Sequence, residues 1–271
     1  MPELPEVEVC RLGITPHIKD QQVAEVVVRQ KQLRWPVPEE VTTIVGQEVS
    51  AVKRRSKYLL LEFDTGTVVI HLGMSGTIRV IPAESPVAKH DHVDIVFQHG
   101  QALRLNDPRR FGAVLWLDKH QDQQGLFTKL GPEPLTDDFA HGYLFEKAQK
   151  RKVPIKTFLM NNQVVVGVGN IYANEALFQA GILPTSLACN IDQTRFNNLT
   201  DIIKNVLAAA IEQGGTTLKD FTQADGRPGY FAQQLLVYGR AGQPCVKCQS
   251  QLQEVRQSNR SSVFCPNCQT E

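Results

Sequence analysis

Four cysteines near the end of the chain have the spacing of a metal site. Cys245 and Cys248 form one CxxC pair, Cys265 and Cys268 form another, and 16 residues separate the pairs. Two such pairs on short loops supply the four thiolates of a tetrahedral zinc site. Two disulfides are disfavoured because no secretion signal is recognised, and a redox motif needs only one pair. The spacing therefore predicts one structural Zn²⁺ ion, which folds the tail rather than catalysing a reaction.

The first residues, MPELPE, are a second place where the residue types allow chemistry. Removal of Met1 leaves Pro2 with a free secondary amine, and an α-amino group titrates near pH ~8, against about 10.4 for lysine. Such an amine can attack a sugar C1′ and form an iminium ion. Glu3 beside it can move protons, and Glu6 lies one helical turn further on. Taken alone, these residues also suit an ordinary Pro- and Glu-rich helix start, and retention of Met1 would leave Pro2 with an amide nitrogen that cannot attack.

The charges do not by themselves identify a partner, because the net charge is only +1. They are nevertheless unevenly placed. One basic cluster contains Lys53, Arg54, Arg55 and Lys57. A second has no acid among its cations, which are Lys147, Lys150, Arg151, Lys152 and Lys156. Either cluster can neutralise phosphates, although for each cluster alone a solvated face is the commoner explanation.

Elements that could position these residues follow from the hydrophobic pattern. A helix is predicted over roughly 2–18, because its apolar residues fall near one face and its glutamates suit a helix N-terminus. Strand-like runs punctuated by Gly, Pro, Asp and Asn come next, and their spacing suggests a sandwich or barrel. The predicted strands cover 23–29, 49–55, 58–63, 67–72, 76–81, 92–97, 102–107 and 113–117.

The pattern changes after about residue 130. Residues 130–136 read as a linker, helical periodicity follows (clearest over 170–182 and 200–215), and 216–232 is polar and glycine-rich. We predict an α+β chain with a β-rich domain over 1–130, a helical domain over 137–232 and a cysteine-bearing module over 235–271.

Composition limits the class of protein. Hydrophobic residues make up 42% and charged residues 21%, which suits a globular core. No apolar run approaches the roughly 20 residues of a membrane helix, and no basic region precedes Arg11 as in a signal peptide. We therefore expect a cytoplasmic protein with no membrane partner.

Read together, the motifs resemble formamidopyrimidine-DNA glycosylase along essentially the whole chain. They are PELPEVE, RRSKYLLLE, HLGMSG, KHDHVD, NDPRRFG, GPEPL, VVGVGNIYANEALF, QGGTTLKDF, the run over 229–239 and the four cysteines. Leu4 favours this family over its sister, endonuclease VIII, whose members typically start PEGPE and prefer oxidised pyrimidines. The resemblance implies an N-terminal β-sandwich with a leading helix, a helical helix–two-turn–helix domain and a zinc finger.

The same resemblance implies a bacterial base-excision-repair enzyme. It would act as a monomer on double-stranded DNA, removing 8-oxoguanine and formamidopyrimidines and cutting at abasic sites, with no redox or organic cofactor. Pro2 matches the Schiff-base nucleophile, Glu3 the proton donor and Glu6 a supporting acid. Lys57 matches a phosphate contact linked to β-elimination, and Arg260 matches the finger arginine associated with δ-elimination.

DNA contacts also follow from the resemblance. Met74, Arg109 and Phe111 match the trio that fills the gap left by an extruded nucleotide, and an apolar wedge suits that task. Arg109 also matches a DNA-contacting position, as do His90, Arg151 and Asn170. Lys156 matches another lysine near the damaged strand. Asn170 opens a predicted helix after VGVG, where N–H groups can hold a phosphate, although asparagine is also an ordinary N-cap.

Some positions depart from the family pattern. Ser56 stands where Ala or Gly is usual, Thr157 where proline is common, and Asn161 and Asn162 where an aspartate often occurs. None of these changes touches the predicted nucleophile. The segment over 216–232 corresponds to a loop that closes over the flipped base, with specificity residues expected at Thr216, Thr217 and Tyr230.

Two alternatives remain at this point. A non-catalytic zinc-finger protein that senses distorted DNA is disfavoured by the intact Pro2, Glu3 and Glu6. Endonuclease VIII is the alternative within the enzyme class, and cleavage of 8-oxoguanine and thymine-glycol duplexes side by side distinguishes the two.

Overall fold

The computed structural model describes residues 2–119, 124–215 and 234–271. The chain divides into two compact units, Met1–Thr128 with Gln213–Ala232, and Lys129–Glu212 with Gln233–Glu271. We call them the first and second unit and describe each by itself. The predicted three-domain boundaries stay predictions. Met1, Thr216, Thr217 and Tyr230 lie outside the described residues.

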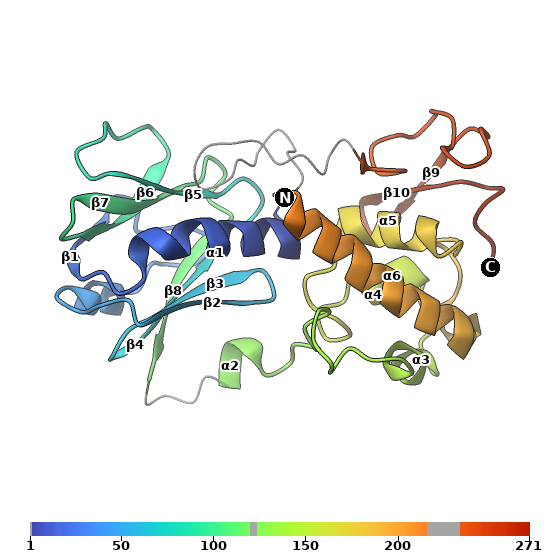
Figure 1. The fold of residues 1–271 in the computed structure, drawn as a ribbon, viewed down its shortest axis with the longest axis horizontal. Coiled ribbons are helices and arrows are strands. Elements are labelled where there is room, and N and C mark those ends of the chain that lie inside the picture. The colour runs from blue at the N-terminus through green and yellow to red at the C-terminus, as the bar shows by residue number, and fades with distance from the viewer. Residues whose placement is uncertain (1, 120–123, 216–233) are drawn as a thin grey trace. The chain divides into compact units, whose positions relative to one another are not determined.

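The first unit begins with helix α1 (Leu4–Ile18), close to the predicted span of 2–18. Its buried apolar residues recur at helical spacing on one face: Leu4, Val7, Cys10, Ile14 and Ile18. This face packs against strands β2 (Ala51–Arg55), β3 (Tyr58–Glu62) and β5 (Thr77–Pro82), so the helix contacts both sheets of the unit (Figure 1). The sequence therefore places Pro2 and Glu3 at the start of a helix that is fixed along its length.

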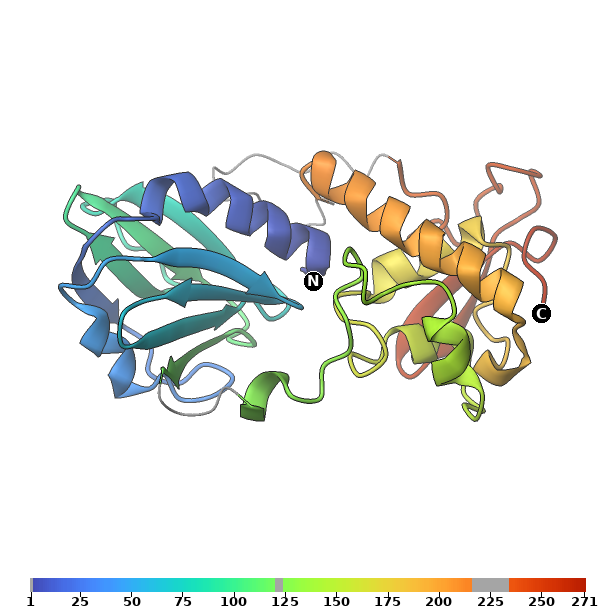
Figure 2. The ribbon, with the colours of Figure 1, turned by 60° about the horizontal axis from the view of Figure 1, so that its bottom comes forward.

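Two four-stranded antiparallel sheets follow α1, with strand orders β1-β6-β7-β5 and β2-β3-β4-β8 (Figure 2). The strands are β1 (Val23–Val28), β2 (Ala51–Arg55), β3 (Tyr58–Glu62), β4 (Gly66–His71), β5 (Thr77–Pro82), β6 (Asp91–Phe97), β7 (Gln101–Asn106) and β8 (Ala113–Asp118). Inward-facing side chains of both sheets and of α1 form one apolar core. All eight predicted strands are confirmed to within about two residues, and the predicted β-sandwich with a leading helix is confirmed.

Strand pairing brings several loops to one end of the first unit. His71 pairs with Ala113, and Asn106 pairs with both Thr77 and Asp91. The segments over 72–76, 88–90 and 107–112 therefore leave neighbouring strand ends. A 3₁₀ helix, η1 (Glu39–Ile44), and a short helix, α2 (Gln124–Phe127), were not predicted.

The second unit is helical with a hairpin. Its helices are α3 (Tyr143–Ala148), α4 (Ile155–Leu159), α5 (Asn170–Gln179), the 3₁₀ helix η2 (Ala188–Asn190) and α6 (Gln193–Glu212). Helix α6 begins seven residues before 200, where the predicted helical periodicity becomes clear, and the Asp192 carboxylate caps it by accepting the Arg195 N–H at 2.8 Å. Helix α5 is buried on nearly all sides and packs on α6.

A cysteine-bearing finger completes the second unit. Strands β9 (Gln253–Gln257) and β10 (Arg260–Phe264) form a hairpin whose two turn residues, Ser258 and Asn259, both have positive φ. Two-residue turns of this kind match the twist of paired strands. The finger packs on α5 through a small core that contains Phe178, Val237, Leu252 and Val263, together with cysteine side chains. The predicted zinc-finger module is thus folded against the helices.

Among the residues that the structure describes, none of the helices combines the length and the apolar character needed to span a bilayer.

Candidate functional site

The predicted nucleophile and both predicted acids lie at the start of α1, where Pro2 and Glu3 directly precede the helix and Glu6 lies in its first turn. Glu3 is the N-cap residue, and its N–H donates to Glu6 Oε2 at 2.8 Å in a reciprocal capping box. Pro2 is buried, and Glu3 and Glu6 are each 1% exposed. The capping box thus fixes both acids at the helix start that directly follows Pro2 in the chain.

Gly215 packs closely on this turn. It has a φ of 79°, and a Cβ there would lie 3.3 Å from Glu6 Cγ and Oε1. A side chain at this position would therefore both strain the backbone and press on the acid. The close approach accounts for a glycine in the QGG motif, whose role the sequence alone did not reveal.

Lys57 lies in the two-residue turn that joins β2 to β3, next to the buried Ser56. Its charge acts on His71, at the end of β4. Burial, reinforced by the positive charges of Arg34 and Lys57, lowers the pKa of His71 to about 4. His71 Nδ1 accepts the Gly73 N–H at 3.0 Å, so the neutral ring carries its proton on Nε2. His71 belongs to the HLGMSG motif, but the sequence alone indicates no role for it.

The predicted gap-filling trio lies on two adjoining loops. The Arg109 guanidinium stacks 4.9 Å from the centre of the Phe111 ring. Met74 and Phe111 line one cavity of about 580 Å³, together with Leu33, Arg34, His71, Gly73 and Arg110. Met74 is 36% exposed and Phe111 45% exposed. Large apolar side chains held at the surface suit a contact with another molecule better than a core role.

Asp107 holds these loops in place. Its buried carboxylate accepts the Ser75 hydroxyl at 2.8 Å and the Gly112 N–H at 2.7 Å. Its own N–H donates to the His90 carbonyl at 3.0 Å. One buried acid thus links the segments that carry Met74, His90 and Phe111. Asp107 belongs to the NDPRRFG motif, but sequence reasoning gave it no function.

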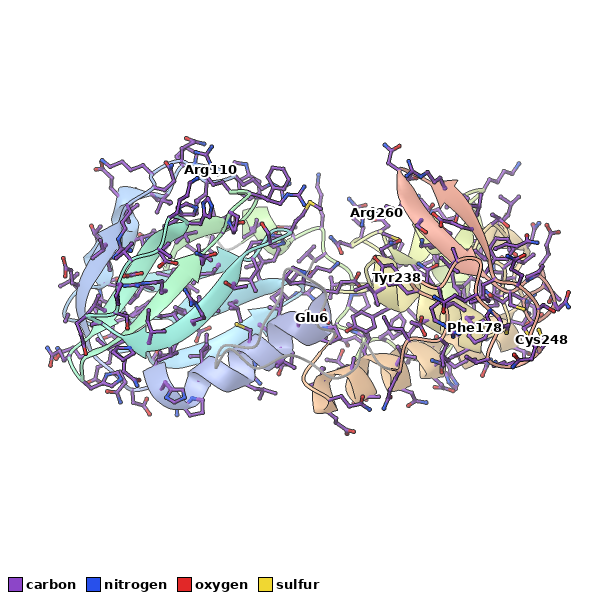
Figure 3. The ribbon with its side chains drawn as sticks, turned by 90° about the horizontal axis from the view of Figure 1, so that it is seen from above. Glu6, Arg110, Phe178, Tyr238, Cys248 and Arg260 are labelled. Atoms are coloured by element: carbon purple, nitrogen blue, oxygen red, sulfur yellow. The ribbon has the colours of Figure 1, made fainter. Side chains whose placement is uncertain are left out.

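In the second unit, Arg151, Lys156 and Arg260 line one cavity of about 390 Å³. Arg151 and Arg260 are exposed, and Figure 3 shows Arg260 on the finger hairpin. Lys156 is different, because it is 1% exposed and its Nζ donates to the Ser261 carbonyl and the Ser262 hydroxyl. This lysine therefore holds β10 against α4, a role that its place in a basic cluster did not suggest.

Asn170 opens α5 directly after its N-cap, Gly169. Its Oδ1 is buried and has no hydrogen-bond partner among the described residues. Asn170 Oδ1 is thus a buried acceptor at a helix start, where the helix also presents its N–H groups.

Glu175 is a functional candidate that sequence reasoning missed. Its carboxylate is 1% exposed and accepts three backbone N–H groups, from Leu236 at 2.9 Å, Val237 at 3.0 Å and Tyr238 at 2.8 Å. Burial nevertheless raises the pKa of Glu175. The only signal in the sequence was a glutamate inside the apolar helix NIYANEALF. This acid ties α5 to the chain that enters the finger.

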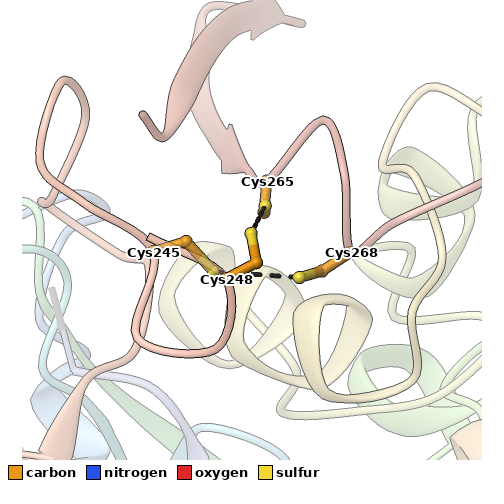
Figure 4. A group of neighbouring side chains, drawn as sticks. All are labelled: Cys245, Cys248, Cys265 and Cys268. Carbon is orange, nitrogen blue, oxygen red and sulfur yellow. Dashed lines mark hydrogen bonds between the residues drawn. The ribbon is translucent and has the colours of Figure 1, made fainter. Parts of the chain in front are cut away.

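The four cysteines form the metal site that their spacing predicts (Figure 4). Their sulfur atoms all lie within 4.8 Å of one another, with 3.9 Å between Cys245 and Cys268 and 3.4 Å between Cys248 and Cys265. A tetrahedron with Zn–S bonds of about 2.3 Å has edges of about 3.8 Å. The donor set and its size therefore fit one structural Zn²⁺ ion. The Lys247 ammonium lies 4.8 Å from the centre of the Phe178 ring and joins this site to α5.

Known proteins match the chain over its full length. The formamidopyrimidine-DNA glycosylase N-terminal domain matches residues 1–114, the H2TH domain of the same enzyme matches 130–222, and the zinc finger found in FPG and IleRS matches 242–270. A formamidopyrimidine-DNA glycosylase of Colwellia psychrerythraea is 73% identical over 271 residues, with 100% of both chains covered. That of Idiomarina loihiensis is 59% identical, covering 99% of this chain and 100% of the relative.

Solved structures of the same family also match the chain. A Lactococcus lactis FPG variant in complex with Fapy-dG-containing DNA has a TM-score of 0.93 at 30% identity, with 100% of both chains covered. A MutM in complex with DNA containing carbocyclic 8-oxo-G has a TM-score of 0.92 at 31% identity and the same coverage. The predicted helix–two-turn–helix domain and zinc finger are confirmed by these matches. The chain is a zinc-finger DNA glycosylase of DNA repair, and it belongs to the formamidopyrimidine-DNA glycosylase family.

Proposed function

We propose that this glycosylase excises oxidised purines, 8-oxoguanine and formamidopyrimidines, through a Schiff base on Pro2, and then cuts the strand as an AP lyase. The observation that carries the proposal is the PELPE turn, with its capped Glu3–Glu6 pair, in a chain 73% identical to a formamidopyrimidine-DNA glycosylase over its whole length. The DNA in the complexes of its structural relatives, Fapy-dG and carbocyclic 8-oxo-G, supports the same substrate class.

The first step joins protein to sugar. After removal of Met1, the lone pair of the Pro2 nitrogen forms a bond to C1′. The glycosidic bond breaks. The purine leaves with the two electrons of that bond and takes up a proton. The nitrogen loses its own proton, the C1′–O4′ bond opens, and O4′ is protonated, which leaves an iminium ion. Glu3 is the proposed proton donor, and Glu6 supports it by fixing the turn.

Strand cleavage follows from the iminium ion. Loss of a C2′ proton expels the 3′ phosphate by β-elimination, and loss of a C4′ proton then expels the 5′ phosphate by δ-elimination. Hydrolysis releases the sugar remnant and leaves phosphate ends at a one-nucleotide gap. Lys57 is proposed to contact the phosphate beside the lesion during β-elimination, and Arg260 to grip the flanking phosphate during δ-elimination.

Binding and base extrusion are assigned to the remaining predicted residues. We propose that Met74, Arg109 and Phe111 fill the gap in the duplex. His90, Arg151 and Asn170 are proposed DNA contacts. Lys156 is proposed to act near the damaged strand through β10, to which its Nζ is bonded. The protein is further proposed to act as a monomer in the bacterial cytoplasm, on double-stranded DNA.

Borohydride trapping tests this proposal. Mature wild-type protein should form a covalent adduct with 8-oxoguanine duplex DNA, whereas Pro2→Gly protein should still bind the DNA but lose strand cleavage. Active, zinc-loaded protein that gives no adduct contradicts the proposal and leaves a DNA-binding protein. A clear preference for thymine-glycol over 8-oxoguanine duplexes would instead assign endonuclease VIII specificity.

A further inference from the structure

A network of three charged side chains joins α1 to β2 in the first unit. Glu8 lies in the second turn of α1, six residues after Pro2. Arg54 Nε donates to Glu8 Oε2 at 2.9 Å, and Arg11 Nε donates to Glu8 Oε1 at 3.0 Å. The side chains of Glu8 and Arg54 are only 16% and 12% exposed. Solvent and salt therefore screen this pair less than a surface ion pair.

Arg54 makes a second contact that reaches the turn carrying Lys57. Its Nη1 donates to the Ser56 carbonyl at 2.9 Å. That carbonyl belongs to the same peptide unit as the Lys57 nitrogen, so the bond fixes the peptide plane from which the Lys57 side chain departs. The guanidinium thus bonds the helix with one nitrogen and the turn with another.

The turn needs such support. Ser56 has a φ of 55° and is 2% exposed. A positive φ is unfavourable for serine because its Cβ crowds the backbone, and glycine is the usual residue there. A strained turn persists only when its surroundings hold it. The Arg54 bond to the Ser56 carbonyl is one such restraint.

We propose that Glu8 and Arg54 are positioning residues that set the Lys57 turn against α1, the helix that begins two residues after Pro2. The inference rests on the proposed function, in which Pro2 and Lys57 act on the same nucleotide. Neither Glu8 nor Arg54 touches the reacting atoms. They act through the Ser56–Lys57 peptide, so their loss should impair whichever step depends on Lys57.

A double-mutant cycle tests the coupling. The rates of base excision, borohydride trapping and strand cleavage are measured for Lys57→Ala, Arg54→Met and the double variant. Arg54→Met should slow the same steps as Lys57→Ala, by about 10-fold, because displaced catalytic groups cost up to roughly 100-fold. In the Lys57→Ala background, Arg54→Met should have little further effect. If Arg54 acted only on stability, the rate losses of the two single variants would multiply in the double variant. That result overturns the proposal.

Two further variants separate positioning from stability. Exchanging the pair, as Glu8→Arg with Arg54→Glu, restores an ion pair but places no donor at the Ser56 carbonyl. It should recover the Tm lost in Arg54→Met without recovering the rates. Recovery of both overturns the proposal. Arg29→Met is the matched control, because Arg29 donates to Asp94 at 2.7 Å in the other sheet, and its loss should leave the Lys57-dependent steps within about 2-fold of wild type.

The proposed function and the positioning role fail in different ways. Wild-type protein that forms no trapped adduct contradicts the function, and with it the inference. Wild-type protein that traps normally, with Arg54→Met equal to wild type at every step, leaves the function intact and overturns only the positioning role.

Discussion

Substitution of Glu175 by glutamine probes how the finger is attached to α5. The glutamine Oε1 can keep the bonds that Glu175 Oε1 accepts from Val237 at 3.0 Å and Tyr238 at 2.8 Å. The glutamine Nε2 then takes the place of Glu175 Oε2, which accepts the Leu236 N–H at 2.9 Å. Two N–H donors would therefore face each other. One buried N–H is left without an acceptor.

The expected cost follows from that single loss. An unsatisfied buried N–H costs about 1–3 kcal/mol, and each kcal/mol lowers the Tm by roughly 2–4 °C in a chain of this size. Val237 shares an apolar core with Cys245, so release of the 236–238 segment should also loosen the zinc site. Zinc transfer to a chelator should accelerate by between about 5- and 140-fold, since about 1.4 kcal/mol corresponds to tenfold.

The assay combines thermal unfolding with zinc release to a coloured chelator. Glu146→Gln on α3 is the control, because that side chain is exposed and its change should move neither measurement. If Glu175→Gln unfolds and releases zinc as wild type does, the carboxylate does not anchor this segment and the account of the finger attachment is wrong.

Three other predictions follow from the structure. Asp94→Ala should destabilise the first unit by about 3 kcal/mol in urea unfolding, because it leaves the buried Arg104 without one of its partners. Arg104 is 1% exposed and donates to Asp94 at 2.8 Å. An unchanged urea midpoint of unfolding contradicts this prediction. Burial lowers the pKa of His71 to about 4 in the folded protein, whereas the ordinary pKa of histidine in an unfolded chain is ~6.5. The unfolded chain therefore binds the proton more tightly, and the free energy of unfolding, highest above pH ~6.5, should fall as the pH drops toward ~4. His71→Asn should flatten that part of the stability–pH curve, and an NMR titration of His71 near pH ~6.5 would refute the burial argument. Cys265→Ser, or chelation of the zinc, should unfold the finger while leaving the sandwich folded by circular dichroism, and loss of both together would contradict the two-unit description.

Much of the fold was predictable because its signals are local. Short strand-like runs punctuated by Gly, Pro, Asp and Asn predicted all eight strands of the sandwich, and the cysteine spacing predicted the metal site. The start of α6 could not be located from the sequence, because its cap is a single side chain, Asp192, which accepts the N–H of Arg195. Its first residues, QTRFNN, are too polar to reveal the helix by periodicity.

The less predictable part of the site depends on contacts between distant residues. Lys156 looked like an exposed member of a basic cluster, yet its Nζ bonds β10 more than 100 residues away in the sequence. Asp107 and Glu175 likewise act on segments that no local pattern connects to them. Charges in apolar surroundings are the one usable sign, because a buried carboxylate must find partners.

Peptide mapping of the borohydride-reduced complex tests the central claim most directly. Tandem mass spectrometry should find that the modified peptide begins at Pro2, with the reduced sugar remnant on its nitrogen and no methionine before it. A remnant on a lysine side chain, or an intact Met1–Pro2 amide in protein that cleaves lesion-bearing DNA, would contradict the account.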